Sequence, residues 1–348
     1  MRSDARADAK LIEPAELARA KEAAERIQAG LDRTLYDQKE LTRLVVVGCL
    51  ARGHVLLEGL PGLGKTELVK ALATLLGIGF KRLQFTPDLL PGDVTGGHVL
   101  EETPKGRALV FHPGPIFTNV LLADEINRAS PKTQSALLEA MQERRVTVLG
   151  ETHVLPQPFY VLATQNPIEL EGTYPLPEAQ LDRFLFKLDV PTVGRGALES
   201  ILVERRMGTP PKLEPATDAA GLAELFRATD AIFLPRAVAN WVARLVHATH
   251  TTSDQAPEKV KAYVRFGASP RAAIAVAEAA RAHALLAGRP NVGFDDVRAV
   301  APSAMAHRIV LDYRARLDGV NGREIVKLVL AAVPELAETM PNEVVEKV

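Results

Sequence analysis

The chain has 348 residues, of which 47% are hydrophobic and 24% are charged, and its formal net charge at pH 7 is -1. This length and composition predict a globular protein with two domains. The near-neutral charge gives no general attraction to nucleic acid, and no stretch approaches the roughly 18 uninterrupted apolar residues of a membrane span. We therefore expect no nucleic-acid partner, no membrane span and a cytoplasmic protein.

The first quarter of the chain predicts three helices and a buried strand. Residues 14–30 are rich in alanine and charged residues, which predicts an amphipathic helix closed by Gly30. Residues 39–52 predict a second helix, and its apolar run contains the single cysteine, Cys49. One cysteine excludes an internal disulfide, so a buried thiol is expected. The remaining elements expected here are a short strand at residues 54–58 and a helix at residues 65–76.

A glycine-rich turn joins that strand to the helix that begins at Lys65. It fits the pattern G-x-x-x-x-G-K-[ST], in which glycines let backbone N–H groups crowd around a polyphosphate. Lys65 supplies a positive charge, the Thr66 hydroxyl reaches Mg²⁺, and the positive end of the helix faces the phosphates. The strand before and the helix after the turn disfavour a glycine-rich turn without a ligand. The residues expected to bind ATP are Gly59, Pro61, Gly62, Gly64, Lys65 and Thr66.

Residues 80–117 interrupt the pattern of helices and strands. Prolines and glycines separate their short apolar pieces, which predicts hairpins inserted into a helical layer. Residues 119–123 then form a nearly continuous apolar run, which is typical of a parallel strand covered on both faces. Asp124 and Glu125 end this strand.

These two carboxylates are the second chemical signal in the chain. The carboxyl end of a strand in an open α/β sheet borders the ligand crevice. We expect Asp124 to hold Mg²⁺ together with Thr66, and Glu125 to accept a proton from the water that attacks the γ-phosphate. Without the phosphate loop, a solvated strand end would explain the pair equally well.

The next elements predict a second polar strand end. Ser130 caps a helix expected at residues 131–143, and residues 146–155 predict a hairpin around a glycine. A strand at residues 159–163 then leads to Asn166. An amide beside the strand that carries the carboxylates can bind both the γ-phosphate and the attacking water. Taken alone, Asn166 is better explained as part of an Asn-Pro turn.

Four segments together resemble a known family. They are GLPGLGKT at residues 59–66, LADEINRA at 122–129, ATQNP at 163–167 and PEAQLDRF at 177–184, and a weaker likeness continues at 267–272. In these motifs the chain is similar to the MoxR-type AAA+ ATPases of the helix-2-insert clade. The first two segments correspond to the Walker A and Walker B motifs of that family.

The resemblance implies roles that the spacing alone leaves open. Asn166 corresponds to sensor 1, and Arg183 to the arginine finger that enters the nucleotide site of a neighbouring subunit. Without the resemblance, Arg183 would be interpreted as a surface arginine paired with Asp182. Arg271 corresponds to sensor 2, and Ser269 caps a helix whose positive end would face the same phosphate. The alternative for Arg271 is an exposed residue at a capped helix end.

The resemblance also implies a fold and domain limits. We expect an α/β fold in which a parallel-sheet P-loop AAA+ core is followed by a small all-helical lid domain. The core is expected at residues 1–193, with the helix-2 insert at about 80–117. A connecting helix and linker are expected at 194–234, and the lid at 235–348, with helices at 235–250, 269–287, 294–306 and 325–332.

For function, the resemblance implies an ATPase with ATP and Mg²⁺ as cofactors, active at the subunit interfaces of a homo-oligomeric ring of six subunits. Such proteins act as chaperones that remodel, mature or assemble a protein complex, often with a partner that has a von Willebrand factor A domain. Two alternatives remain at this point. One is a nucleotide-dependent binding scaffold, and the other is a chelatase-like subunit that drives metal insertion.

Overall fold

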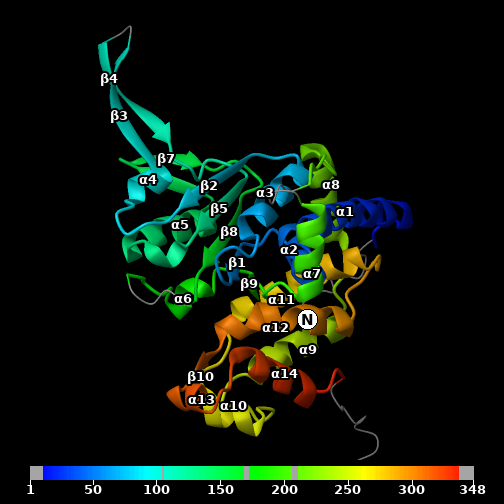
Figure 1. Ribbon diagram of the computed structural model, residues 1–348. Coiled ribbons are helices and arrows are strands. Elements are labelled where there is room, and N and C mark those ends of the chain that lie inside the picture. The colour runs from blue at the N-terminus through cyan, green and yellow to red at the C-terminus, as the bar shows by residue number, and fades with distance from the viewer. Residues whose placement is uncertain (1–10, 104–105, 168–171, 206–210, 337–348) are drawn as a thin grey trace, which may run out of the picture.

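The computed structural model describes residues 11–103, 106–167, 172–205 and 211–336. Its centre is a parallel five-stranded sheet with the strand order β2-β5-β8-β1-β9 (Figure 1). The strands are β1 (Val55–Glu58), β2 (Phe80–Gln84), β5 (Val120–Asp124), β8 (Tyr160–Gln165) and β9 (Phe186–Asp189). The parallel α/β core expected from the sequence is therefore confirmed.

Apolar side chains cover both faces of the sheet. Leu57, with alternate residues of β5 and β8, joins the larger core cluster beneath α1 (Pro14–Thr34), α2 (Lys39–Leu50) and α3 (Lys65–Leu76). Leu56 points the other way, into a second cluster that includes residues of α5 (Pro131–Glu143). Successive residues of a strand face opposite sides, so a strand buried on both faces needs the unbroken apolar run seen in the sequence.

Gly30 does not end the first helix, contrary to expectation, because α1 continues to Thr34. A Cβ atom at Gly30 would lie 2.4 Å from a methyl group of Leu75 on α3. Glycine at this position lets α1 pack closely on Leu75 of α3, and it does not act as a helix cap. The thiol of Cys49 is buried in α2 as predicted, and burial raises its pKa to about 12.

The inserted segment starts later than the sequence suggests. Residues 80–84 form β2, an edge strand of the main sheet that runs parallel to β5, and are not part of a hairpin. This prediction was wrong because Lys81 and Arg82 interrupt the apolar pattern of a buried strand. The insert consists of α4 (Pro91–Thr95) and one antiparallel hairpin, β3 (Gly96–Thr103) and β4 (Gly106–Pro113), which projects from the core (Figure 1).

The second predicted hairpin is confirmed. Its strands are β6 (Arg145–Val148) and β7 (Glu151–Val154), which pair antiparallel after α5. The Ser130 hydroxyl accepts a hydrogen bond from the backbone N–H of Thr133 and so caps α5. Short 3₁₀ and helical turns follow β5 and precede β9, at η1 (Ile126–Arg128) and α6 (Glu178–Leu181).

A helical domain follows the core, as expected. Its helices are α9 (Arg236–His247), α10 (Glu258–Tyr263), α11 (Pro270–Leu286), α12 (Phe294–Met305), α13 (Tyr313–Leu317) and α14 (Gly322–Ala332), with the short elements β10 (Val264–Phe266), η3 (Ala306–Arg308) and β11 (Val310–Leu311). Trp241 is fully buried, and its indole N–H donates to the carbonyl of Val333 at 3.0 Å. None of the described helices is both long enough and apolar enough to cross a bilayer.

In the described part of the segment expected as a connecting helix and linker, the chain forms two helices. The expected one is α7 (Arg195–Glu204), and the sequence analysis missed α8 (Ala219–Ala231). Asp218 caps α8, and Leu222 and Leu225 are buried on its inner face. This spacing was the signal that could have revealed the helix. Residues 206–210, expected as part of the linker, lie outside the described residues.

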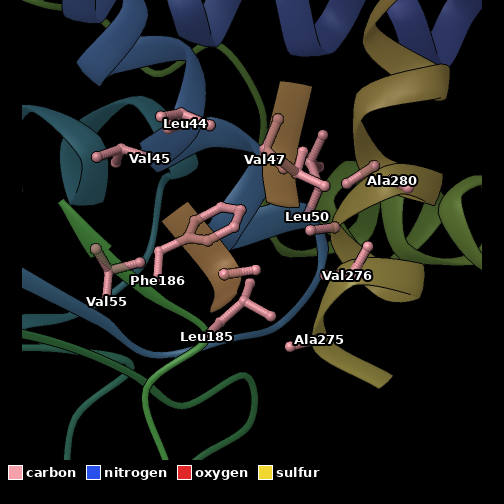
Figure 2. Packing of buried hydrophobic residues seen from close by; sticks show 14 of the residues in the cluster. Leu44, Val45, Val47, Leu50, Val55, Leu185, Phe186, Ala275, Val276 and Ala280 are labelled. Carbon is pink, nitrogen blue, oxygen red and sulfur yellow. The ribbon is translucent and has the colours of Figure 1, made fainter. Parts of the chain in front are cut away.

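The lid and the core share one hydrophobic cluster. Figure 2 shows Val47 and Leu50 of α2 near Val276 and Ala280 of α11, with Phe186 of β9 in the same group. The alanines on this face of α11 let the two helices approach closely. The lid is therefore held to α2 and β9 of the core by apolar packing as well as by the chain connection.

Buried His54 predicts a pH-dependent stability. Its Nδ1 accepts from the N–H of Val161 at 3.0 Å, its Nε2 lies 3.1 Å from the carbonyl of Met141, and burial lowers its pKa to about 4. A histidine in the unfolded chain binds a proton near pH 6.5. The stability that comes from burying neutral His54 is therefore fully present above pH 6.5 and is lost as the pH falls toward 4. We expect a loss of about 2 kcal/mol between pH 7 and pH 5 in urea unfolding. The His54→Gln variant should show a smaller pH dependence, and an unchanged one would contradict the assignment.

Candidate nucleotide-binding site

The phosphate loop has the backbone shape that its glycines predict. Gly62 and Gly64 adopt positive φ angles of 81° and 80°, in the left-handed region that other residues rarely enter. A Cβ atom at Gly59 would lie 2.9 Å from the side chain of Val190. The loop leads from β1 directly into α3, which starts at Lys65. Its backbone N–H groups and the helix N-terminus therefore border one concave surface.

Lys65 is buried inside this loop. Its ammonium group donates to the carbonyl of Gly59 at 2.6 Å. Burial lowers the pKa of Lys65, and the negative charges of Asp124, Glu125 and Glu58 oppose that shift. A buried ammonium is screened by less water, so it attracts a phosphate group more strongly than a surface lysine does.

Asp124 stands at the carboxyl end of β5 between two donors. Its Oδ1 accepts from the Thr164 hydroxyl at 2.6 Å, and its Oδ2 accepts from the Arg82 guanidinium at 2.6 Å. Arg82 was not recognised from the sequence because it lies on β2, which was assigned to the insert. In the described arrangement Arg82 neutralises the carboxylate that is expected to serve Mg²⁺.

Glu125 is held in a strained position beside Asp124. Its φ angle of 55° is unusual for a residue with a side chain. Its backbone N–H donates to Thr164 at 2.8 Å, and its Oε2 accepts from Gln84 at 2.7 Å and from Arg128 at 2.8 Å. Both side-chain donors bind Oε2, so Glu125 can accept a proton at Oε1 without losing either contact.

One cavity of about 370 Å³ brings these groups together. Its lining residues are Pro61, Gly62, Gly64, Lys65, Thr66, Glu67, Arg82, Gln84, Asp124, Glu125 and Asn166. Gly59 lies behind this surface and holds Lys65, and Asn166 follows the end of β8, next to β5. The cavity combines a phosphate cradle with a hydroxyl and a carboxylate, which is a donor set that fits a nucleotide triphosphate with Mg²⁺.

Arg183 and Arg271 lie elsewhere and do not line this cavity. The backbone N–H of Leu185 donates to the carbonyl of His54 at 2.8 Å, so the Arg183 segment lies beside the amino end of β1. The phosphate loop follows the carboxyl end of that strand. The five residue steps of extended chain from His54 to Gly59 span about 16 Å at 3.3 Å per step, which exceeds the reach of an arginine side chain.

Asp182 does not pair with Arg183, so the pairing considered for the sequence alone is wrong. Asp182 accepts from Arg308 at 2.8 Å and from the Ser269 hydroxyl at 3.1 Å, and lies 3.5 Å from Arg271. Among the described residues, the Arg183 side chain has no salt-bridge partner, and its Nε is buried without a hydrogen bond. Asp182 thus joins the segment that carries Arg183 to Arg271 and Arg308, at the junction of core and lid.

Arg308 of η3 fixes this junction and was missed in the sequence. Its guanidinium donates to the carboxylate of Asp182 and to the carbonyls of Phe184 at 2.7 Å and Leu185 at 3.1 Å. The side chain is only 3% exposed. Because 126 residues separate it from Asp182, no local motif indicates the contact. Arg308 locks the segment that carries Arg183 onto the lid.

Replacing Lys65 with alanine should abolish nucleotide binding. The variant removes the buried positive charge at the centre of the phosphate cradle, while the backbone of the loop stays in place. Binding of a fluorescent ATP analogue measures the effect. Lys70→Ala, an exposed lysine one turn further along α3, is the matched control and should bind like the wild type. Normal binding by Lys65→Ala would contradict the assignment of the cavity.

The fold and the cavity together define the class of protein. A parallel sheet covered by helices on both faces, a phosphate loop after β1 and acidic residues after β5 are the parts of a P-loop ATPase. Residues 54–186 match the model of the ATPase family associated with various cellular activities (AAA), and residues 257–329 match that of the AAA lid domain. Both matched regions fall where the structure has its sheet and its helical domain.

Whole-chain comparisons narrow the class to a family. Chaperone MoxR1 of Mycobacterium tuberculosis is 43% identical, with 89% of this chain and 83% of that protein covered. Protein YeaC of Bacillus subtilis, described as uncharacterized, is 44% identical, with 87% and 92% covered. A crystal structure of a candidate ATPase from Cytophaga hutchinsonii superimposes with a TM-score of 0.85 at 35% identity, over 93% of this chain and 98% of the other. This chain belongs to the MoxR-type AAA+ ATPases.

Proposed function

We propose that this protein hydrolyses ATP to ADP and phosphate in the cavity after β1. The observation that supports this best is the convergence of Lys65, Asp124, Glu125 and Asn166 on that one cavity. Lys65 and the loop backbone bind the phosphates, Glu125 takes a proton from the attacking water, and Asn166 orients that water. Bound Mg²⁺ would neutralise phosphate charge, and Thr66 and Asp124 would hold it.

Mg²⁺ binding requires a change at Asp124, because Arg82 now occupies its Oδ2. Both residues line the cavity, so the guanidinium can turn from the carboxylate toward a bound phosphate. The position of the Arg82 guanidinium would then depend on whether a nucleotide is bound. Gln84, its neighbour on β2, binds both Arg82 and Glu125, so a movement of Arg82 would also shift the position of the base.

The two remote arginines support hydrolysis at subunit interfaces. Arg183 and Arg271 lie at the end of the sheet away from their own phosphate loop, so both would act on the nucleotide of a neighbouring subunit. Asp182 would place Arg271 beside Arg183 for this purpose. A closed ring, with six subunits, supplies each site with such a neighbour. We assign the core to residues 1–193 and the lid to residues 235–348 of each subunit.

The work done by the ring would be the remodelling or assembly of a client protein complex, in the cytoplasm and with a von Willebrand factor A domain partner. One relative carries the name of a chaperone. The projecting hairpin supports a role in protein contact, since Leu100 and Leu109, which lie opposite each other on its two strands, are 60% and 62% exposed. Apolar side chains grouped on a projecting surface are typical of a protein-binding site.

A photo-crosslinking amino acid at Leu100 tests this role. In the Glu125→Gln background, which should retain ATP, we expect an adduct with a protein partner that forms with ATP and is lost with ADP. The same probe at Leu317, an exposed lid residue on α13, is the control and should give no ATP-dependent adduct. Mass spectrometry identifies the adduct. No ATP-dependent adduct at Leu100, with nucleotide bound, would contradict the client-binding role of the hairpin.

A further inference from the structure

Three metal-ligating side chains meet where the two hairpins contact each other. His98 comes from β3, and Glu151 and His153 come from one face of β7. One ligand atom from each residue lies within 4.8 Å of the other two, and His98 Nε2 is 3.5 Å from Glu151 Oε2. The cluster is separate from the nucleotide cavity, which none of the three residues lines.

The histidines of this cluster are partly buried, and each has a buried nitrogen atom without a hydrogen-bond partner among the described residues. The His98 side chain is 8% exposed, and its Nδ1 is buried without a hydrogen-bond partner among the described residues. His153 Nε2 is buried in the same way. Buried polar atoms normally have a partner, because desolvation without one costs about 1–3 kcal/mol. A bound ion would supply the missing interaction of His153 Nε2.

The surrounding contacts orient the rings. Phe111 of β4 stacks on the imidazole of His153, with ring centroids 3.7 Å apart and planes inclined by 8°. Phe111 also lies beside His98, at 5.6 Å between centroids. Rings held in this way keep their nitrogen atoms near one point, which reduces the entropy that a metal ion must overcome on binding.

We propose that His98, Glu151 and His153 form a binding site for a divalent transition-metal ion of the zinc class. Two imidazoles and one carboxylate are donors that Zn²⁺ accepts, with bonds of about 2.0–2.2 Å. In tetrahedral geometry these bonds place ligand atoms about 3.4 Å apart. The 3.5 Å separation between His98 and Glu151 already matches this value. Rotation of the exposed Glu151 and of neighbouring side chains would bring the other ligand atoms, now within 4.8 Å of one another, to the same spacing.

The metal would act as a clamp between the hairpins. His98 and Glu151 belong to separate hairpins and are 53 residues apart in the chain, so the ion would tie the base of β3 to β7. Three protein ligands leave a fourth position for water. The orientation of the projecting hairpin would then depend on metal, independently of ATP binding.

Titration of the untagged full-length protein with ZnCl₂, followed by calorimetry in excess Mg²⁺, tests the site. We expect one Zn²⁺ per chain, and Co²⁺ should give the visible absorption of a tetrahedral site. Amide hydrogen exchange within residues 96–103 and 151–154 should slow when Zn²⁺ is added. The single cysteine does not compete, because burial raises the pKa of the Cys49 thiol to about 12.

Variants distinguish this site from adventitious binding. His98→Gln and His153→Gln should each weaken Zn²⁺ binding by at least about tenfold. His112→Gln is the matched control, since His112 pairs with Glu101 on the same hairpin at 2.7 Å without a second histidine, and should bind Zn²⁺ like the wild type. Circular dichroism and nucleotide binding verify that each variant is folded. The proposal would be overturned if the wild type did not bind Zn²⁺ stoichiometrically. It would also be overturned if folded His98→Gln and His153→Gln bound Zn²⁺ as tightly as the wild type.

Discussion

Replacing Glu125 with glutamine should slow ATP hydrolysis by about 10²- to 10⁴-fold and leave ATP bound. The amide keeps the size of the side chain but cannot accept the proton of the attacking water. The phosphate loop and Lys65 are unchanged, so the affinity for a fluorescent ATP analogue should stay near that of the wild type. Steady-state phosphate release and analogue binding, measured on the same preparation, give both values.

The control for this variant is Glu139→Gln, which changes an exposed glutamate of α5 away from the cavity. It should hydrolyse ATP at the wild-type rate. Full activity in Glu125→Gln would refute the assignment of Glu125 as the base. Loss of ATP binding together with activity would instead show that Glu125 mainly organises the cavity through Gln84 and Arg128.

Replacing Arg183 with alanine should reduce hydrolysis by about 10³- to 10⁵-fold, the range associated with arginine fingers. ATP affinity should change little, because Arg183 does not line the cavity of its own subunit. Mixing Arg183→Ala with Lys65→Ala should restore some turnover. In mixed rings, an intact nucleotide site of the first variant can lie beside an intact arginine of the second.

The matched control is Arg227→Ala, an exposed arginine of α8. It should assemble and hydrolyse ATP like the wild type. When it is mixed with Lys65→Ala, the ATPase activity of the mixture should not exceed the sum of the activities of the two variants measured separately. If Arg183→Ala assembles normally but is not rescued by Lys65→Ala, Arg183 acts within its own subunit. That outcome would contradict the distance argument made from the strand direction.

Local motifs in the sequence were sufficient to predict that the phosphate loop, Asp124, Glu125 and Asn166 would meet at one place. The phosphate loop, Asp124 and Glu125 each follow a recognisable strand, and parallel strands bring their carboxyl ends to one edge. Asn166 was placed beside the carboxylates for the same reason, because β8 neighbours β5. Helix limits were also predictable where a cap marks them, as Gly77 does at the end of α3 with a φ of 64°.

Contacts between distant segments could not be predicted in this way. Arg82 binds Asp124 from the edge strand β2, which was not predicted because polar residues interrupt its apolar pattern. Arg308 reaches Asp182 from the lid, and the His98 cluster joins two hairpins. Each contact depends on tertiary packing that no residue spacing records. Gly30 shows the reverse error, where a residue typical of helix ends serves close packing inside a helix.

In the proposed ring, an arginine of a neighbouring subunit would complete each nucleotide site. The most direct test measures the specific ATPase activity against protein concentration, with molecular mass followed by light scattering, for the wild type and Arg183→Ala. We expect the activity of the wild type to rise as the ring assembles, and the assembled variant to remain inactive. Constant activity in a persistent monomer, unchanged by Arg183→Ala, would contradict the shared-site mechanism.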